Sequence, residues 1–488
     1  MIKKLTVKHF RSIEEVNLDF GAITSLIGPN NAGKSNLMKA LDLLLGLSYP
    51  SARSFSDHDF YKYDKTSPIF LQIMFDSQLA TNPNVWGFQM TYDGSDFGYF
   101  AVDRLGRVLT YPSQKEIRVS TDMKDEVTLM YLGLDREASE QVRPSQWTLY
   151  GKLLRYIEKS IDPAKKTAFI QGIKSAYDSN VAADIQTLET ILRDCVKEQT
   201  GLELHLKMQL VDPIDTIKNL RPFLSDSSAS LEFDAEHMGA GTQSALAVAI
   251  ARAYGQIVAK PLVLAIEEPE LYLHPHGCRN FHKILKHLSQ NNVQIIYTTH
   301  DRCFVDISDF NSVRLVKRET GDTTVCSGFG QYATLQSQVS AASKFDEEIN
   351  EVFFANHVVL TEGYPDKVAC VSALTSLGLD LDKHCVSIID CGGLPNIEPI
   401  AKVLGLFHIP TYALIDEDPE NPATATAIAS LKTLLGAENV FLQTPNLEGL
   451  FGLRKKPTKA ESIVYFPTRF TTHPPQPVYN AVKNSIAP

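Results

Sequence analysis

The sequence has few cysteines and lacks any long hydrophobic run. Its 7 cysteines are scattered along 488 residues, are odd in number and form no CxxC pair. This excludes a disulfide framework and a cysteine zinc site, and it is typical of reduced thiols. No apolar run approaches the roughly 20 residues that cross a bilayer, and the N-terminal residues alternate like a strand instead of forming the apolar core of a signal peptide. We therefore expect a cytoplasmic protein with no membrane partner.

The chain also lacks an excess of positive charge. Its formal net charge is -10 at pH 7, so any contact with nucleic acid must come from local basic patches rather than from a global field. A hydrophobic content of 44% and a charged content of 21% describe an ordinary soluble globular protein. At 488 residues the chain is too long for one hydrophobic core, which predicts two or three domains.

A complete phosphate-binding loop lies near the N-terminus. Residues 28–35 read GPNNAGKS, directly after an apolar strand predicted at 23–27 and before a helix predicted at 36–45. In such a loop the glycines let backbone N–H groups point at the phosphates, the lysine reaches the β and γ phosphates, and the serine hydroxyl is placed for Mg²⁺. We predict that ATP is bound by Asn30, Asn31, Ala32, Gly33, Lys34, Ser35 and Asn36.

A buried strand further along the chain ends in two carboxylates. The apolar segment 261–266 runs into Glu267 and Glu268, and the tip of such a parallel strand meets the edge of a sheet where ligands bind. We predict that Glu267 holds Mg²⁺ through water, and that Glu268 orients and deprotonates the attacking water. The alternative is an acidic cap of the following helix.

Two weaker signals fit the same nucleotide site. The glycine-rich segment 238–244 precedes a helix predicted at 245–254 and suits a γ-phosphate. The candidate contacts there are Gly239, Gly241, Gln243 and Ser244. His300 ends the strand predicted at 294–299 and could sense the γ-phosphate, although a single histidine is more often structural.

Between these motifs the hydrophobic period changes to that of helices. Apolar residues recur at helical spacing from residue 145 to about 200. This segment interrupts an otherwise alternating order of strands and helices, so it is expected to be a helical insertion. Its apolar faces are expected to pack on each other or on a second subunit.

The C-terminal part places carboxylates at the ends of several predicted strands. Glu362 follows a strand at 358–361, with Asp366 four residues later, and Asp416 and Asp418 follow a strand at 411–415. Glu448 follows a third strand, at 440–442. Carboxylates so close would repel and raise one another's pKa unless a cation were present. Mg²⁺ or Mn²⁺ suits such oxygen ligands, and two such ions can cleave a phosphodiester. The alternative is that the acids only cap helices.

The last forty residues are basic. From residue 449 onward Glu461 is the only acid, while the basic residues are Arg454, Lys455, Lys456, Lys459, Arg469 and Lys483. A charge run is usually a solvated face, but beside a metal site it is more plausibly a track for phosphates.

The motifs and their order along the chain resemble those of known protein families. Residues 10–12 (FRS), the phosphate loop, segment 239–244, the Glu-Glu-Pro-Glu at 267–270 and Thr299-His300 resemble the ABC-type ATPase heads of the RecF/SMC group. Glu362-Gly363 followed by Asp416 and Asp418 resembles the Toprim fold. An ABC head followed by Toprim resembles the OLD (overcoming lysogenization defect) family of nucleases, which includes the nuclease subunit of the Gabija anti-phage system.

The resemblance implies a fold and residue roles. It implies an α/β chain with an ABC-type (RecF/SMC-like) P-loop ATPase domain at 1–345, a helical insertion at 145–200 and a Toprim domain at 346–488. Two heads would close so that segment 239–244 of one completes the ATP site of the other, with His300 as the switch histidine. The metal ligands would be Glu362, Asp366, Asp416, Asp418 and Glu448. Glu362 could also act as a base, and the family's C-terminal catalytic lysine would be Lys456 or Lys459.

The leading hypothesis is an ATP-regulated, Mg²⁺- or Mn²⁺-dependent endonuclease that cleaves or nicks DNA. It would act as a homodimer or larger assembly, in anti-phage defence or DNA metabolism, and a helicase encoded alongside is a candidate partner. One alternative is an SMC-like ATP-driven DNA-binding protein without nuclease activity. Another is a nuclease that acts on RNA.

Overall fold

The computed structural model describes residues 1–133, 143, 145, 148–200, 220–225, 232–258, 260–271, 273–330 and 347–487. The chain forms two compact units. The first contains Met1–Leu134 and Pro261–Pro488, and the second contains Asp135–Lys260. The domain boundary predicted after residue 345 lies within 331–346, outside the described residues.

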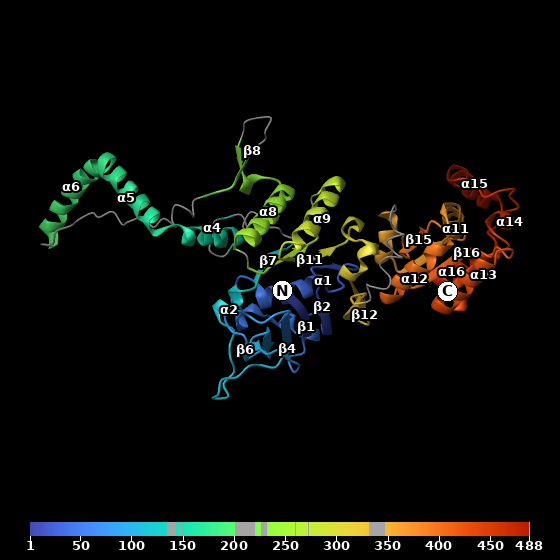
Figure 1. Cartoon of the computed structure of the whole chain (residues 1–488), viewed down its shortest axis with the longest axis horizontal. Helices are drawn as coiled ribbons and strands as arrows, with labels where there is room; N and C mark the ends of the chain where they lie inside the picture. Colours follow the sequence, from blue (N-terminus) through green and yellow to red (C-terminus); the bar gives the residue numbers. More distant parts are fainter. Residues whose placement is uncertain are drawn as a thin grey trace. The chain divides into compact units, whose positions relative to one another are not determined.

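An antiparallel sheet opens the first unit (Figure 1). Its strand order is β2-β1-β4-β5-β6, and every neighbouring pair is antiparallel. These strands are β1 (Ile2–Phe10), β2 (Ile13–Asp19), β4 (Ile69–Phe75), β5 (Gly87–Tyr92) and β6 (Phe97–Val102). Burial alternates strictly along β4, as expected for a strand with one face in the core. Helix α1 (Lys34–Leu45) packs into this core through Leu37, Leu41 and Leu44.

A second sheet carries the phosphate-binding loop. Its order is β13-β12-β3-β11-β10-β7, and all neighbours except β12 and β13 are parallel. The strands are β3 (Ile23–Ile27), β7 (Thr128–Leu132), β10 (Leu262–Glu267), β11 (Val293–Thr299), β12 (Val313–Glu319) and β13 (Asp322–Ser327). Every residue of β10 and β11 is buried, which explains the apolar run of β10 before Glu267, whereas β11 also buries Gln294, Thr298 and Thr299. Because β3, β11 and β10 are parallel neighbours, their C-terminal ends lie at one edge.

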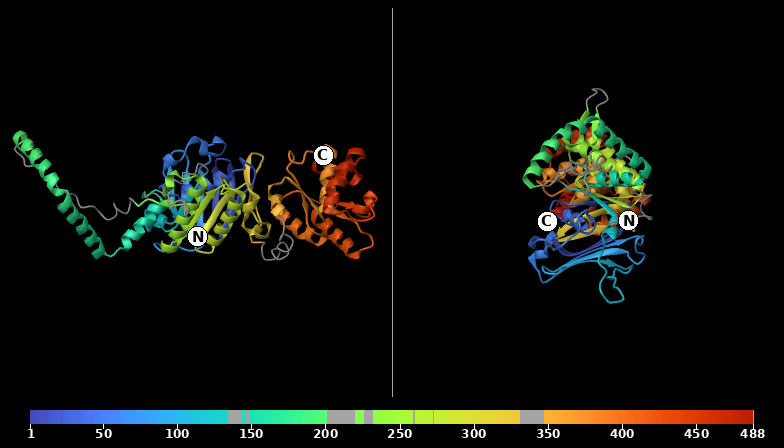
Figure 2. Two further views of the ribbon diagram at one scale, coloured as in Figure 1. Left: turned by 90° about the horizontal axis from the view of Figure 1, so that it is seen from above. Right: turned by 90° about the vertical axis from the view of Figure 1, so that its left-hand side faces the viewer.

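A third sheet begins after residue 356, with parallel strands in the order β15-β14-β16-β17. Helices cover both of its faces (Figure 2). Along β14, Val358 and Leu360 enter one core while Val359 enters the other, which is the period of two expected of a strand enclosed on both sides. The strands are β14 (His357–Thr361), β15 (Val386–Asp390), β16 (Thr411–Asp416) and β17 (Val440–Gln443). The helices are α11 (Tyr364–Ser376), α12 (Ile397–Leu406), α13 (Pro422–Leu435), α14 (Leu447–Phe451), α15 (Lys459–Thr472) and α16 (Pro477–Ile486).

The described part of the second unit is largely helical. Helix α4 (Leu149–Ser160) packs on α8 (Ala240–Val258), whereas α5 (Pro163–Asn180) has no buried residue. Helices α5 and α6 (Ala182–Thr200) meet at a bend (Figure 1). The pair β8 (Phe223–Ser225) and β9 (Glu232–Asp234) forms a small antiparallel sheet. Helix α8 begins at residue 240 rather than at the expected 245, so the glycine-rich segment forms its first turn.

The remaining regular elements are one long helix, which packs on β11, and several short helices. They are α2 (Thr121–Asp125), α9 (Pro275–Ser289) and the 3-10 helices η1 (Ala52–Ser54), η2 (Asp57–Asp59), η3 (Tyr61–Tyr63), η4 (Ala235–His237), η5 (Arg302–Phe304), η6 (Ile307–Ser312), η7 (Glu347–Phe354), η8 (Leu394–Asn396) and η9 (Ala437–Asn439). Within the described ranges, no helix combines the length and the apolar character needed to cross a membrane.

Candidate functional site

The phosphate-binding loop requires two of its glycines. Gly28 has φ +140° and Gly33 has φ +110°, in the region that side chains rarely adopt. A Cβ on Gly28 would lie 2.0 Å from the carbonyl oxygen of Val316, and one on Gly33 would lie 2.3 Å from Oγ1 of Thr323. The loop therefore packs so closely on β12 and β13 that no other residue fits at these two positions.

Lys34 is held inside the loop. Its Nζ donates to the carbonyl oxygens of Gly28 and Pro29, each at 2.9 Å. Burial lowers the pKa of Lys34 to about 8, although Glu268 and Glu267 favour its charged form. The loop therefore holds the Lys34 ammonium in place through its own carbonyl oxygens.

Ser35 contacts Glu267, the carboxylate that is predicted to bind the same Mg²⁺ ion. The Ser35 hydroxyl donates to Glu267 Oε2 at 3.2 Å, and the Tyr131 hydroxyl donates to Glu267 Oε1 at 2.7 Å. Glu267 is almost fully buried at the end of β10. A hydroxyl and a carboxylate oxygen at this distance fit a Mg²⁺ ion, which takes oxygen ligands. Tyr131 was missed in the sequence because β7 carries no recognisable motif.

Glu268 adopts a strained backbone conformation at the candidate catalytic position. Its φ is +44°, which is uncommon for a residue other than glycine. The Glu268 N–H donates to the carbonyl oxygen and to Oγ1 of Thr298, at 2.9 and 3.1 Å, and these bonds fix the turn. The Glu268 carboxylate then lies 3.6 Å from Nε2 of His300. Such strain, held by neighbouring bonds, is typical of functional sites.

His300 is held by its own backbone. Its N–H donates to Glu270 Oε1 at 2.7 Å, so the third acid of the Glu-Glu-Pro-Glu segment positions the histidine. Burial lowers the pKa of His300, and the nearby Lys34 charge acts in the same direction. The imidazole is therefore kept neutral at physiological pH.

These residues surround one cavity of about 520 Å³. It is lined by Ser12, Asn30, Asn31, Gly33, Lys34, Ser35, Asn36, Glu268, Thr298, His300 and Arg318. Ala32 does not line the cavity; its carbonyl oxygen accepts from Thr323 Oγ1 at 2.9 Å, which holds the loop against β13. Thr298 and Arg318 were not expected from the sequence: Thr298 directly precedes the Thr299-His300 motif without belonging to it, and Arg318 lies near the end of β12, which carries no motif. The nucleotide-binding role of the loop residues stays a prediction that this cavity supports.

The glycine-rich segment belongs to the second unit. Gly239 precedes α8, Gly241 lies in its first turn, and Gln243 and Ser244 are buried. The Gln243 side chain donates to the carbonyl oxygen of Glu236 at 2.9 Å. Contact of these residues with a nucleotide stays a prediction.

A second constellation lies at the C-terminal edge of the third sheet. Lys456 Nζ lies 3.0 Å from Asp416 Oδ2 and 3.1 Å from Asp366 Oδ2. Glu362 follows β14, and its Oε1 accepts from the backbone N–H of Asp416 at 2.9 Å. The structure therefore brings Glu362 and Asp366, Asp416, and Lys456 together from three separate segments of the chain.

Burial disfavours the ionised form of these carboxylates and so raises their pKa values. Asp366 and Asp416 are only 1% and 4% exposed. Burial raises the pKa of Glu362 to about 7 and that of Asp366 to about 6, and the neighbouring carboxylates add to both shifts. Burial also raises the pKa of Asp416, while Lys456 opposes this change. The cluster is thus a place where a further cation would be bound favourably.

The other residues predicted for this site, Asp418, Glu448 and Lys459, make different contacts. Asp418 has φ +37°, and its Oδ1 accepts from the Asn446 amide at 3.2 Å. Glu448 lies in the first turn of α14, and among the described residues no hydrogen bond or ion pair links its carboxylate to the cluster. Lys459 Nζ lies 4.9 Å from the centre of the Tyr364 ring rather than among the acids. Of the two candidate lysines, Lys456 has the geometry of a catalytic group.

The donor set fits a hard divalent cation, although a complete cage is not formed. Among the residues that the structure describes, no group of three or more His, Cys, Asp and Glu is arranged to hold a metal ion. Yet the Oδ2 atoms of Asp366 and Asp416 converge on one cation, the Lys456 ammonium. Buried carboxylates that converge in this way are oxygen ligands of the kind that Mg²⁺ and Mn²⁺ prefer.

Comparison with known proteins identifies the family. Residues 1–125 and 116–305 match the family described as AAA ATPase domain, and residues 353–418 match the overcoming lysogenization defect protein-like TOPRIM domain. The OLD nuclease of Thermus scotoductus is 30% identical over 489 residues, covering 93% of this chain and 92% of that protein. The chain belongs to the OLD nuclease family.

More distant matches extend this comparison. Endonuclease GajA of Bacillus cereus is 21% identical over 503 residues, covering 93% of this OLD family member and 82% of that protein. A solved Smc head domain from Pyrococcus furiosus is 14% identical with a TM-score of 0.42, covering 68% of this chain and 97% of that one. The family matches confirm the expected fold class, an ATPase domain followed by a Toprim domain, and the expected enzyme class, an ATPase and nuclease.

Proposed function

We propose that this OLD family member is an ATP-regulated, divalent-metal-dependent endonuclease that cleaves DNA. The observation that carries the proposal is the meeting of Glu362, Asp366, Asp416 and Lys456 at one edge of a parallel sheet. A relic of a catalytic site would have no reason to keep two buried carboxylates, Asp366 and Asp416, around one lysine. The ATP cavity is built separately, at the edge of the second sheet.

The arrangement suggests a role for each side chain. Asp366, Asp416 and Glu362, with Asp418 beside them, would hold Mg²⁺ or Mn²⁺, which stabilises the attacking and leaving oxygens of a phosphodiester. Lys456 would place its positive charge on the phosphate, where negative charge develops. Glu362 could also act as the base that accepts a proton from the attacking water.

Regulation by ATP is supported by a shared hydrophobic core. Ile27 and Leu315, from strands next to the phosphate loop, belong to the same core as Val358 and Leu360 of β14. Lys317 Nζ also donates to the carbonyl oxygens of Phe407 and His408, at 3.2 and 3.0 Å. A change in the ATPase sheet would therefore reach the strand that presents Glu362.

Self-association is supported by the surface of the helical insertion. Apolar side chains of α5 and α6 are exposed: Phe169 by 42%, Leu188 by 47% and Ile191 by 58%. We propose that these helices pack against a second copy, and that segment 239–244 of that copy completes the ATP site. A partner helicase and a role in anti-phage defence also belong to the proposal, and both rest on the family alone.

One experiment tests the activity and its site together. Purified full-length protein is incubated with supercoiled plasmid or a tRNA pool, in Mg²⁺ or Mn²⁺, with and without ATP. We expect plasmid cutting that changes with ATP, and loss of cutting but not of ATP hydrolysis in Glu362→Ala and Asp416→Ala. Cleavage of tRNA alone would contradict the DNA assignment, and cutting unaffected by nucleotide would contradict regulation. Cutting retained in both variants would contradict the site.

A further inference from the structure

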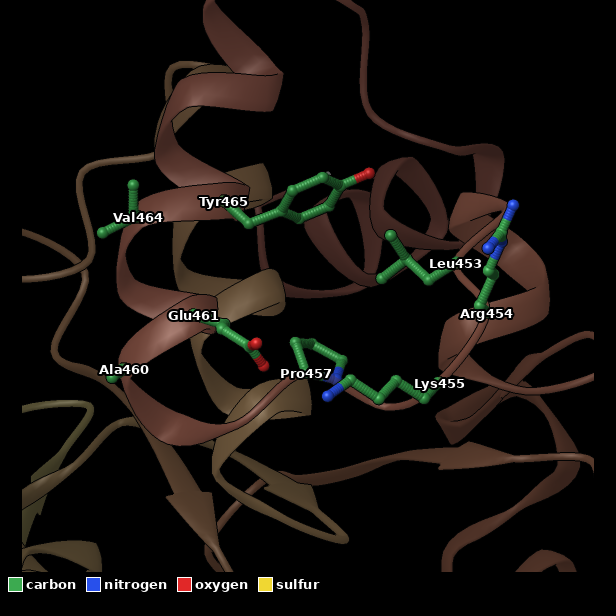
Figure 3. Close-up of a pocket in the computed structure, with 8 residues that line it drawn as sticks. All are labelled: Leu453, Arg454, Lys455, Pro457, Ala460, Glu461, Val464 and Tyr465. Carbon is green, nitrogen blue, oxygen red and sulfur yellow. The ribbon is translucent and has the colours of Figure 1, made fainter.

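A groove opens beside the loop that carries Lys456. It has a volume of about 690 Å³ and is lined by Leu453, Arg454, Lys455, Pro457, Ala460, Glu461, Val464 and Tyr465. Figure 3 shows the Tyr465 ring, Leu453 and Pro457 around the groove, with Arg454 at one end. Its lining residues flank Lys456 on both sides in the sequence, so the groove and the carboxylate cluster share one loop.

The groove combines an apolar lining with exposed positive charge. Val464 is 68% exposed, an unusual position for a large apolar side chain, while Arg454 and Lys455 are both exposed. The one acid, Glu461, is engaged locally, because its Oε2 accepts from the backbone N–H of Thr458 at 2.7 Å. An aromatic and apolar surface bordered by cations suits a ligand that has flat rings and phosphates.

We propose that this groove binds unpaired nucleobases of the nucleic acid next to the bond that is cut. Base stacking on aromatic side chains combined with backbone contacts to basic residues is how single strands are bound without sequence preference. Tyr465 would supply the stacking face, and Arg454 and Lys455 would contact the phosphates. The inference rests on the proposed nuclease function and names its substrate as DNA with a single-stranded or opened segment.

Binding of two labelled oligonucleotides tests the groove. Fluorescence anisotropy of full-length protein in EDTA compares a mixed-sequence single strand with an abasic strand of equal length. We expect Tyr465→Leu to bind the mixed-sequence strand about tenfold more weakly and the abasic strand unchanged. Tyr465→Phe, which keeps the ring, should bind both strands like the wild type. ATP hydrolysis should be unchanged in both variants.

Tyr465 also packs edge-on against Phe451. Because Tyr465→Leu removes this contact and could affect folding, a second variant is needed. Val464→Glu leaves that packing intact and should weaken binding of both strands by repelling phosphates. Wild-type affinity in both Tyr465→Leu and Val464→Glu would contradict nucleobase binding in the groove but would leave the nuclease proposal unaffected. A changed number of subunits in light scattering, with binding intact, would make the groove a protein interface and also overturn the groove proposal. Wild-type protein that neither binds nor cuts would contradict the proposed function itself.

A different observation carries a second inference, on Gln443. This residue ends β17, is fully buried and lies directly opposite Asp416 in the strand register. Carboxylate oxygens only accept, so the Gln443 amide nitrogen faces them: it donates to Asp416 Oδ1 at 2.9 Å and to Asp366 Oδ1 at 3.1 Å. Its amide oxygen accepts from the Tyr479 hydroxyl at 3.3 Å.

The amide therefore fixes the rotation of both carboxylates. With Oδ1 of each acid bound to Gln443, Oδ2 of each is turned toward Lys456 Nζ. We infer that Gln443 is a positioning residue, which holds Asp366 and Asp416 in the orientation that binds the metal ion. This inference also rests on the proposed function.

Calorimetric titration of full-length protein with Mn²⁺ tests this role. Loss of a residue that orients metal ligands typically weakens metal binding about 10- to 100-fold, so we expect a weakening of this size in Gln443→Leu, with ATP hydrolysis unchanged. Tyr479→Phe, which removes only the hydroxyl that holds the amide, should weaken Mn²⁺ binding less and serves if Gln443→Leu does not fold. Mn²⁺ affinity equal to that of the wild type in both variants would overturn the inference. Wild-type protein without Mn²⁺ binding would instead contradict the metal site.

Discussion

The Lys456 ammonium lies 3.0 Å from Asp416 Oδ2, and through the same nitrogen it also reaches Asp366 Oδ2. The positive charge at this point is shared by two buried carboxylates. Both acids raise the pKa of Lys456, although burial opposes them. Its raised pKa keeps the lysine protonated at neutral pH and makes it a poor proton donor. Its contribution to cutting must be electrostatic.

Lys456 and Lys459 form a matched pair for testing this contribution. Lys456→Ala should reduce DNA cutting about 100-fold or more, as expected when a group that stabilises transition-state charge is removed. Lys459→Ala should keep most of the activity, because Lys459 stacks on Tyr364 and not on the acids. Initial rates on supercoiled plasmid measure both. Equal losses in the two variants would contradict the assignment of Lys456.

The metal-free cluster should destabilise the protein at neutral pH. Burial raises the pKa of Glu362 from 4.5 to about 7. The folded state then binds more protons than the unfolded state between these values, so the free energy of unfolding falls as pH rises from about 4.5 to 7. Glu362→Gln removes this loss. We expect it to raise the melting temperature at pH 8 by about 2–4 °C for each kcal/mol regained, without a metal ion.

The control for this effect is an exposed acid on the same domain. Glu420→Gln should leave the melting temperature unchanged at either pH, because Glu420 is exposed. Differential scanning calorimetry in EDTA at pH 4.5 and pH 8 measures both variants. A Glu362→Gln protein that melts below the wild type at pH 8 would show that the carboxylate is stabilised by other contacts.

Metal binding should strengthen as pH rises toward neutrality. The ligands bind a cation in their ionised form, and Glu362 and Asp366 are protonated below pKa values of about 7 and about 6. Each proton that the metal must displace weakens its apparent affinity about tenfold per pH unit below the pKa. Mn²⁺ titrations at pH 6, 7 and 8 should show an affinity that rises and then levels off. An affinity independent of pH across this range would place the metal elsewhere.

The sequence predicts residues at strand ends well because parallel strands fix them. The apolar run before Glu267 and the strand before Glu362 could only end at the ligand-binding edges of their sheets. Gln443 was missed, since a glutamine at the end of a four-residue strand matches no motif. The choice between Lys456 and Lys459 was also open, because it depends on the path of an irregular loop. Contacts across strands need the register, which the sequence does not state.

The same limit applies to the ATP site. Tyr131 contacts Glu267 from a strand more than 130 positions away in the sequence, and Thr323 supports the loop from β13. Neither residue belongs to a local pattern. By contrast, the glycines at 28 and 33 were predictable, because the conformations of this loop exclude any side chain. Positions that need a special backbone conformation can therefore be predicted from the sequence. Contacts between residues far apart in the sequence depend on packing and cannot.

Glu268 should separate ATP binding from ATP hydrolysis. It lies on the cavity wall with His300, while the phosphates would be held by Lys34 and the loop backbone. Glu268→Gln keeps the size of the side chain and removes the base. Hydrolysis should fall about 100-fold or more, as for loss of a general base, while a fluorescent ATP analogue still binds with wild-type affinity. Phosphate release and fluorescence titration measure the two quantities.

Glu319→Gln provides the matched control, because Glu319 is exposed at the end of β12 and lies outside the cavity lining. It should hydrolyse ATP at the wild-type rate. If Glu268→Gln also loses nucleotide binding, the carboxylate acts as a structural brace of the turn after β10, for which its φ of +44° would then be the reason. If binding persists and hydrolysis stops, the protein is held in its ATP state. DNA cutting by that trapped state then shows directly whether bound ATP opens or closes the nuclease site.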